Sequence, residues 1–370
     1  IEMSCSPGGA RPFCRRHEHC SPDCLPRSQP SARERCNPPA EEPTVTGEPM
    51  SADLSSEICV FSPGLRLTVT VENGPRGEEI HLHPGGQGYW LARSIERLGS
   101  PVVLCAAVGG EVGDVLIPLL ESDTGIELVA VKQSAPSSVS MYDRRSGSRT
   151  LIARSEPSSM DRHAVDKLYS LTLAHAIGRG CCVLAGNIDT GVIPPSYYGR
   201  LCADLTAVGV PIITDVHGSE LAAILDHCSI QLVKLSDENL REDGALDHAT
   251  DQELAAAVSD LADRVSNDLV VTRGPDRPAV ARMDGRWYTV SPPRLAAVDW
   301  RGAGDAMAGA MAVAYLRGLG GADALRFGAA AGAASVTRRG LASLDSELVD
   351  ALLSRVRVDT ADDVARAVTT

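Results

Sequence analysis

One segment in the last third of the chain has the composition of an anion-binding turn: Val298-Asp299-Trp300-Arg301-Gly302-Ala303-Gly304-Asp305, followed by Ala306-Met307-Ala308-Gly309. An apolar stretch precedes a turn of small residues, and an Ala-rich helix is predicted to begin at that turn. The backbone N–H groups of Gly302, Ala303 and Gly304 can converge on one point because no bulky side chain blocks them. The helix N-terminus adds partial positive charge there, so the segment predicts a site for an anion, typically phosphate.

Asp305 follows this turn and falls on the first turn of the predicted helix. A carboxylate at that place can accept the proton of an attacking hydroxyl. An anion hole beside a base is what phosphoryl transfer requires. A structural alternative exists, because Gly-Ala-Gly also makes tight turns and Asp also caps helices. The spacing alone leaves both interpretations open.

Length and charge narrow the class of protein. The chain has 370 residues and a net charge of −13. The length suits one large α/β domain, with or without a small appendage, and the charge argues against a nucleic-acid partner. Neither an apolar run of membrane-spanning length nor a secretory signal is evident. The chain is therefore expected to be cytoplasmic, with no membrane partner and with its cysteines from Cys59 onward as buried thiols.

Residues 1–55 differ from the rest of the chain. They are rich in Pro, Ser, Arg and Cys and lack helix or strand periodicity, so they are predicted to be a disordered or non-native extension. Met50 is then the expected natural start. The alternative is a zinc site formed by Cys14, His17, His19, Cys20 and Cys24. Their spacing matches no standard zinc finger, which disfavours that alternative.

Residues 56–370 are predicted to form one domain in which apolar strands alternate with amphipathic helices. Four segments of its second half are predicted strands: Cys181–Ala185, Pro211–Asp215, Ile230–Lys234 and Leu269–Thr272. Strands of this kind with helices between them predict a parallel sheet covered on both faces. Extended segments at about 65–83 and 129–153 interrupt the alternation and predict a small β-sheet that stands off as a lid.

The informative polar residues fall where the predicted strands end. Asp215, Lys234, the run 272–274 and the turn 302–305 all follow apolar strands directly. In parallel sheets ligands bind at the carboxyl ends of the strands. The shared placement therefore predicts a single active-site cleft.

With these features in place, the chain resembles the PfkB (ribokinase-like) family of carbohydrate kinases, nearest the branch of 1-phosphofructokinases and tagatose-6-phosphate kinases. The match rests on 299–309, on Gly85-Gly86-Gln87-Gly88 continuing to Leu98-Gly99, and on Thr272-Arg273-Gly274. The resemblance implies a ribokinase-like three-layer α/β/α sandwich with a mostly parallel central sheet. It also implies ATP- and Mg²⁺-dependent transfer of the γ-phosphoryl group to a hydroxyl of a sugar or sugar phosphate.

The resemblance also implies a role for each matching residue. Asp305 is the expected base, with an anion hole made of Gly302, Ala303 and Gly304. The expected nucleotide contacts are Lys234, Thr272, Arg273 and Gly274. The expected substrate contacts are Gly85, Gly86, Gln87, Arg66 and Trp90. Glu238 is the candidate magnesium ligand, and a homodimer through the lid is left open.

Several positions depart from the family pattern. Arg66 stands where the family usually has a sugar-binding Asp, Gln87 where it has Lys, and Trp90 where it has Asn. The family's Lys-Pro-Asn-x-x-Glu stretch, which helps to place magnesium, reads Lys234-Leu235-Ser236-Asp237-Glu238-Asn239 and lacks both the Asn and the Glu. These changes affect recognition and leave Asp305 and its turn intact.

Two hypotheses follow from these departures. The first is a working kinase with an altered acceptor: a nucleoside, an aromatic-bearing molecule stacked on Tyr89 or Trp90, or an anion held by Arg66. The second is a catalytically degenerate protein that binds nucleotide or sugar as a sensor. The intact Asp305 favours the first hypothesis.

Overall fold

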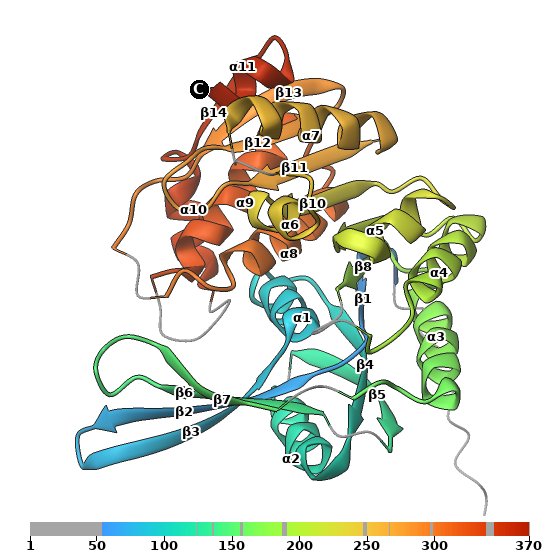
Figure 1. Ribbon diagram of the computed structural model, residues 1–370, viewed down its shortest axis with the longest axis vertical. Helices are drawn as coiled ribbons and strands as arrows, with labels where there is room; N and C mark the ends of the chain where they lie inside the picture. Colours follow the sequence, from blue (N-terminus) through green and yellow to red (C-terminus); the bar gives the residue numbers. More distant parts are fainter. Residues whose placement is uncertain are drawn as a thin grey trace, which may run out of the picture. The chain divides into compact units, whose positions relative to one another are not determined.

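A computed structural model describes residues 54–123, 125–134, 137–155, 158–186, 191–246, 250–265, 267–296, 299–337 and 344–369 (Figure 1). The predicted extension therefore lies outside the described residues, apart from residues 54 and 55, which enter the short 3₁₀ helix Leu54–Ser56. The alternative zinc site lies outside them altogether.

The large sheet of the described part has ten strands in the order β14-β13-β12-β11-β10-β9-β8-β1-β4-β5. Their bounds are β14 Arg357–Ala361, β13 Arg286–Ser291, β12 Ala279–Met283, β11 Asp268–Thr272, β10 Leu232–Ser236, β9 Ile212–Asp215, β8 Cys181–Ala185, β1 Ile58–Ser62, β4 Val102–Gly109 and β5 Ile126–Gln133. Strands β11 to β5 pair in parallel, and β12, β13 and β14 add an antiparallel edge. Strands β1, β4 and β8 are buried along their whole length, which explains their uninterrupted apolar sequences.

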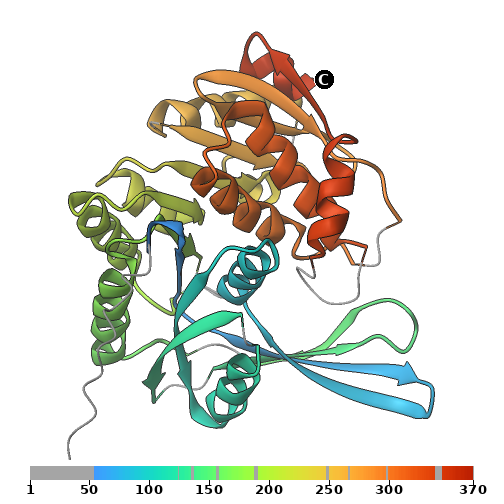
Figure 2. The same cartoon turned by 180° about the vertical axis from the view of Figure 1, so that it is seen from behind.

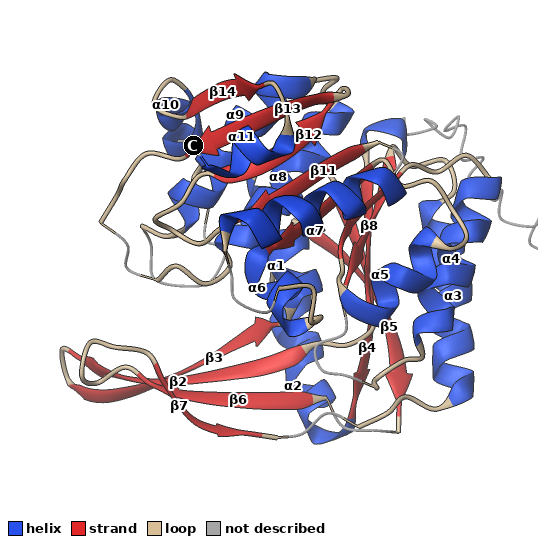
Figure 3. Cartoon of the chain, turned by 45° about the horizontal axis from the view of Figure 1, so that its top comes forward, coloured by secondary structure: helices blue, strands red, loops and turns tan. Residues whose placement is uncertain are grey.

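Helices cover both faces of this sheet (Figures 2 and 3). One face packs against α1 Gln87–Arg97, α2 Gly110–Glu121, α8 Ala303–Leu316, α9 Gly321–Ser335 and α10 Ser346–Leu353. The other packs against α3 Arg162–Ala176, α4 Pro195–Ala207, α5 Gly218–Leu225, α6 Asp237–Glu242, α7 Asp251–Arg264 and α11 Val364–Thr369. Because side chains alternate along a strand, Ile58 and Val60 join the first core while Cys59 and Phe61 join the second. The predicted three-layer α/β/α sandwich is confirmed.

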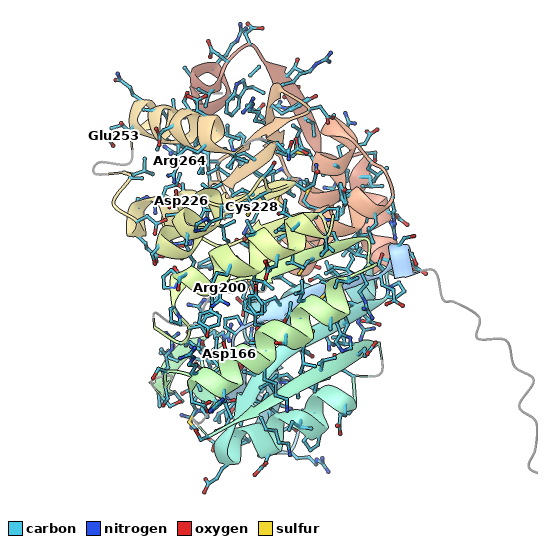
Figure 4. All side chains as sticks on the ribbon, turned by 90° about the vertical axis from the view of Figure 1, so that its right-hand side faces the viewer. Asp166, Arg200, Asp226, Cys228, Glu253 and Arg264 are labelled. Atoms are coloured by element: carbon cyan, nitrogen blue, oxygen red, sulfur yellow. The ribbon has the colours of Figure 1, made fainter. Side chains whose placement is uncertain are left out.

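The outer layer of the second face turns charged side chains to solvent. Figure 4 shows Asp166 on α3 and Arg200 on α4 at this surface, with Arg264 at the end of α7, and all three residues are exposed. Their helices bury apolar residues on the opposite side. This is the amphipathic pattern from which the sequence predicts helices over a covered sheet.

A second sheet has the strand order β3-β2-β6-β7, with bounds β2 Arg66–Gly74, β3 Gly77–Gly85, β6 Ser138–Asp143 and β7 Thr150–Arg154. It is the predicted small sheet, and it contacts α2 through β2 and β3. One boundary of the prediction is wrong: residues 129–133 belong to β5, where Val129 pairs with Cys105 of β4. Because β5 is the edge strand, its faces are only partly buried, and the resulting alternation looked like that of a free-standing hairpin.

No helix within the described ranges is long and apolar enough to cross a membrane. The cysteines in the same ranges are all free thiols: Cys59, Cys105, Cys181, Cys182, Cys202 and Cys228. All but Cys228 are buried, as the apolar sequence around them predicts. The cytoplasmic location stays a prediction.

Close packing of α1 on β1 depends on a glycine. A Cβ at Gly88 would lie 2.3 Å from Cβ of Ser62, the last residue of β1. We therefore expect Gly88→Ala to lower the free energy of unfolding by about 1–3 kcal/mol, because the methyl group overpacks the contact. Urea denaturation measures this. Gly113→Ala in α2 is the matched control, since its Cβ would lie 3.3 Å from the nearest atom; equal losses in both variants would contradict the packing argument.

Candidate active site

The turn before α8 adopts the conformation that its small residues predict. Gly302 is the N-cap with φ 81° and ψ −1°, in the left-handed region that glycine adopts without steric cost. Its carbonyl oxygen accepts the first helical hydrogen bond from the N–H of Ala306 at 2.9 Å. Upstream, Oδ1 of Asp299 accepts a hydrogen bond from the N–H of Arg301 at 3.2 Å. The helix begins at Ala303, and Asp305 lies in its first turn.

A buried ion pair lies against this turn. Nζ of Lys234, near the end of β10, donates to Oδ2 of Asp215, the last residue of β9, at 2.8 Å. Each of the two side chains is only 5% exposed. A Cβ at Gly304 would lie 2.6 Å from Nζ of Lys234. The ammonium group therefore packs directly on the backbone of the turn, and a Cβ at residue 304 would displace it.

The side chain of Gln87 joins three elements at the same place. Its Nε2 donates to the backbone oxygen of Asp215 at 3.0 Å, and its Oε1 accepts from the N–H of Gly186 at 2.6 Å. Gln87 is the first residue of α1, and it follows Gly86, whose φ of 103° favours glycine. The Gly85-Gly86-Gln87 turn is thus held at the carboxyl ends of β8 and β9.

The electrostatic surroundings raise the pKa of Asp305 to about 7. Burial of the carboxyl group is the main cause, and the negative charge of Asp215 adds to it. The positive charge of Lys234 and a hydrogen bond from Gln87 act in the opposite direction. Asp305 keeps intermediate exposure as a residue. A carboxyl group that titrates near neutral pH is well suited to exchange a proton with a bound hydroxyl.

These contacts bring four predicted residues together: Asp305, Gly304, Lys234 and Gln87. They add Asp215, to which the sequence assigned no role beyond its place at a strand end. The signal for Asp215 was there, because an acidic residue ends one buried strand and a lysine lies near the end of another. What the sequence does not give is the adjacency of β9 and β10, which the strand order supplies.

One predicted nucleotide contact needs correction. Arg273 is buried, and its Nη1 donates to the carbonyl oxygen of Val368 at 2.6 Å while its Nη2 donates to Oδ1 of Asp251 at 2.7 Å. The guanidinium therefore joins α11 to the start of α7 and is not available to a nucleotide. Thr272 ends β11 and Gly274 follows with φ 72°. Their predicted nucleotide contacts stay predictions.

The aromatic part of the predicted substrate site also needs correction. Tyr89 and Trp90 are only 3% and 9% exposed, and both belong to the apolar core beneath α1. Their rings contact each other edge-on, with centroids 4.8 Å apart. Stacking an acceptor on either ring would require opening this core. Arg66 begins β2, and its Nε donates to Oγ of Ser138 at 3.0 Å. Its predicted contact with an acceptor is untested.

The segment that replaces the expected magnesium motif forms a helix start. Oγ of Ser236 accepts from the N–H of Asn239 at 3.2 Å, and Oδ1 of Asn239 accepts from the N–H of Ser236 at 3.0 Å. This capping box satisfies the free N–H groups at the start of α6. Asp237 pairs with Arg241 at 2.6 Å, and Glu238 is exposed. The assignment of Glu238 as a magnesium ligand stays a prediction.

The comparison with protein families agrees with this geometry. Residues 61–347 match the model described as "pfkB family carbohydrate kinase". The chain belongs to the pfkB family of carbohydrate kinases. This pfkB chain is therefore an ATP-dependent phosphotransferase that acts on a sugar hydroxyl, as the sequence predicts.

Curated relatives of this pfkB kinase include phosphofructokinases. It is 27% identical over 300 residues to "ATP-dependent 6-phosphofructokinase isozyme 2" of Mycobacterium tuberculosis, covering 78% of this chain and 86% of the relative. It is 23% identical over 305 residues to the 1-phosphofructokinase of Vibrio cholerae, covering 80% of this chain and 94% of the relative.

Solved structures share its fold. Phosphofructokinase-2 from Escherichia coli in complex with potassium aligns with a TM-score of 0.71 at 21% identity, covering 82% of this chain and 99% of that one. The ribokinase of Arabidopsis thaliana complexed with ribose and ATP aligns with a TM-score of 0.61 at 21% identity, covering 81% of this chain and 98% of that one. At these identities the likeness shows the fold alone.

Proposed function

We propose that this kinase transfers the γ-phosphoryl group of ATP to a hydroxyl of a sugar or sugar phosphate, with Asp305 as the catalytic base. One observation supports the proposal above all. A carboxyl group with a pKa near 7 lies in the first turn of α8, beside a glycine turn and a buried lysine. The relatives named 6-phosphofructokinase and 1-phosphofructokinase favour a sugar phosphate as the acceptor.

The proposed step uses the charges around the turn. Asp305 accepts the proton of the acceptor hydroxyl, and the oxygen attacks the γ-phosphorus in line with the leaving oxygen of ADP. The N–H groups of Gly302, Ala303 and Gly304 and the ammonium of Lys234 stabilise the negative charge on the transferred group. In the structure Lys234 is paired with Asp215. That pair holds the ammonium group against the turn.

The donor atoms around Asp215 fit a magnesium ion. Mg²⁺ is usually held by one or two carboxylates together with substrate phosphates, and it prefers oxygen ligands. Asp215 supplies a carboxylate close enough to Asp305 for its charge to raise the pKa of that residue. Among the described residues no three acidic, histidine or cysteine side chains form a metal cluster, so the nucleotide would have to complete the shell. The ion would neutralise charge on the phosphates.

We also propose that two copies associate through the lid. Four of its large apolar side chains are well exposed: Ile80 at 69%, Leu82 at 45%, Leu151 at 44% and Ile152 at 52%. Ile80 and Leu82 pair with Val71 and Val69 of β2 and so share one face of the sheet. Exposed apolar groups on a protruding sheet favour burial against a partner. Sedimentation of the purified protein tests this association.

Turnover against a panel of acceptors tests the proposed function. Purified protein is incubated with ATP and Mg²⁺ and with sugars, sugar phosphates or nucleosides, and ADP formation is followed. We expect acceptor-dependent ADP formation that stops when EDTA removes the metal. ATP binding without turnover on any acceptor would favour the degenerate, ligand-sensing alternative. Turnover on nucleosides alone would replace the proposed acceptor class.

The raised pKa of Asp305 predicts a pH dependence. The base acts only when deprotonated, so kcat/KM should rise with pH through about 7 and level off above it. At one pH unit below the pKa, about a tenth of the enzyme carries the ionised base. A pH–rate profile with a saturating metal concentration measures this. A profile that stays flat from pH 5.5 to 8 would contradict the assignment of Asp305.

A further inference from the structure

Gln87 and Asp305 lie at the starts of two helices that pack against each other. Gln87 is the first residue of α1, and Asp305 lies in the first turn of α8. Four residues further along each helix the two backbones are in close contact, because a Cβ at Gly309 of α8 would lie 3.1 Å from the backbone oxygen of Leu91 in α1. This packing one turn into both helices fixes their starts relative to each other.

The side-chain amide of Gln87 has a fixed orientation. Its Oε1 accepts from the N–H of Gly186, which follows β8, and its Nε2 donates to the backbone oxygen of Asp215, which ends β9. Turning the amide over would place oxygen against oxygen and N–H against N–H, so these two backbone groups select one orientation. The amide is therefore tied to two strands of the sheet as well as to its own helix.

The second N–H of the same amide serves Asp305. Burial is the main influence on the pKa of Asp305 and raises it, whereas a hydrogen bond from the side chain of Gln87 lowers it. A hydrogen bond that lowers the pKa of a carboxyl group is donated to its ionised form. Nε2 is the only donor atom of the Gln87 side chain, and it carries two hydrogens. The amide thus holds the backbone of Asp215 and the carboxylate of Asp305 at once.

We propose that Gln87 is a positioning residue that holds the carboxylate of Asp305 in place for proton transfer, rather than a contact of the acceptor. This inference rests on the proposed function, in which Asp305 is the base. Both hydrogens of the amide are used within the chain, and its oxygen already accepts one hydrogen bond. This favours the positioning role over the substrate contact that the sequence predicts. A carboxylate has two oxygen atoms, so the one that Gln87 holds leaves the other for the acceptor hydroxyl.

Gln87→Met tests this role, because methionine has a similar length but forms none of the hydrogen bonds of the amide. We expect kcat, measured where the pH–rate profile has levelled off, to fall by about 10- to 100-fold, since a small misplacement of a catalytic group has an effect of this size. KM for the acceptor should change by less than about twofold. A raised KM for the acceptor with unchanged kcat would make Gln87 an acceptor contact and overturn the inference.

Gln231 provides a matched control. Burial raises the pKa of Asp268, and a hydrogen bond from the side chain of Gln231 acts in the opposite direction, as the bond from Gln87 does at Asp305. Asp268 begins β11 and Gln231 precedes β10, so this pair lies at the amino ends of the strands, away from the turn before α8. Gln231→Met should leave kcat and KM unchanged. A loss of kcat as large as that in Gln87→Met would overturn the inference.

A double-mutant cycle measures whether Gln87 acts through Asp305. If it does, Gln87→Met should cause no further loss of kcat in the Asp305→Asn background, because the group that Gln87 positions is gone. An equal fold-loss in both backgrounds would mean that the two residues act independently, and would overturn the inference. If Gln87→Met does not fold, Gln87→Glu takes its place with the same expectation. Its carboxylate still accepts from the N–H of Gly186 but donates nothing to Asp305.

The titration of Asp305 gives a second readout that needs no turnover. Its carboxyl carbon is followed by NMR in protein labelled with ¹³C-aspartate, and the signal is assigned by its absence in Asp305→Asn. Asp215 and Lys234 are the charged groups that act on this carboxyl group, and neither changes in Gln87→Met. We expect the titration midpoint to rise by about one pH unit in that variant, because the lost hydrogen bond favoured the ionised form.

The NMR titration also separates this inference from the proposed function. An unshifted midpoint in Gln87→Met would overturn the inference, whatever the turnover of the wild-type protein. A raised midpoint together with no turnover on any acceptor would refute the proposed function and still confirm that Gln87 holds the carboxylate of Asp305.

Discussion

Asp305→Asn is expected to lower kcat by about 10²- to 10⁴-fold, the usual contribution of a general base. The amide has nearly the same size as the carboxyl group but accepts no proton from an acceptor hydroxyl. The pKa of about 7 means that the wild-type side chain is substantially ionised at neutral pH. ATP affinity should change little, because the predicted nucleotide contacts are Lys234, Thr272 and Gly274 and do not include Asp305. Steady-state kinetics and equilibrium binding of ATP measure the two effects separately.

A matched control is available on the neighbouring helix. Asp323 lies in the first turn of α9, as Asp305 does in α8, and it pairs with Arg326 at 2.7 Å on the surface. Asp323→Asn makes the same chemical change at the same helical position and should leave kcat unchanged. If Asp305→Asn kept more than about a tenth of wild-type kcat, the role of base would have to be given up, since the loss would fall below the range for such a group.

Lys234→Met is expected to lower the free energy of unfolding by about 3–5 kcal/mol. The substitution removes one member of a buried ion pair and leaves Asp215 without its partner in a site that is 5% exposed. It also removes the ammonium that lies against Gly304, so ATP binding should weaken as well. Chemical denaturation and nucleotide titration measure the two losses.

Two controls separate charge from packing. The double variant Lys234→Met with Asp215→Leu removes both charges and should recover most of the lost stability, because no unpaired charge remains buried. It should not recover ATP affinity. Breaking the exposed pair Arg326–Asp323 by Arg326→Met should cost no more than about 1 kcal/mol. If Lys234→Met also lowered the free energy of unfolding by no more than about 1 kcal/mol, the stabilising role of the buried ion pair would be contradicted.

Much of the fold follows from local sequence. Strands such as β1 and β8 are apolar at every position because both faces of the sheet are covered. The turn at Gly302 can be predicted from the sequence because glycine alone adopts its left-handed backbone conformation without steric cost. The error at β5 has a physical origin, since an edge strand of a covered sheet and a strand of a free-standing sheet share partial burial and alternation.

The site was less predictable because it depends on which strands are neighbours. Asp215 and Lys234 meet only because β9 lies beside β10, and nothing local to either strand specifies that order. Trp90 was assigned to the substrate by its place in a motif, but the side of α1 on which it lies packs against the core. Arg273 was assigned in the same way, and its guanidinium is held by α11, a contact between segments far apart in the chain.

We propose that this kinase transfers phosphate from ATP to a hydroxyl acceptor with Asp305 as the base. The most direct test follows radioactive γ-phosphate from ATP onto the acceptor panel, with wild type and Asp305→Asn side by side. Label should move to a sugar or sugar phosphate in the wild-type reaction and should be nearly absent from the product in the variant. Label that stays in ATP although the nucleotide binds, or equal transfer by both proteins, would contradict the claim.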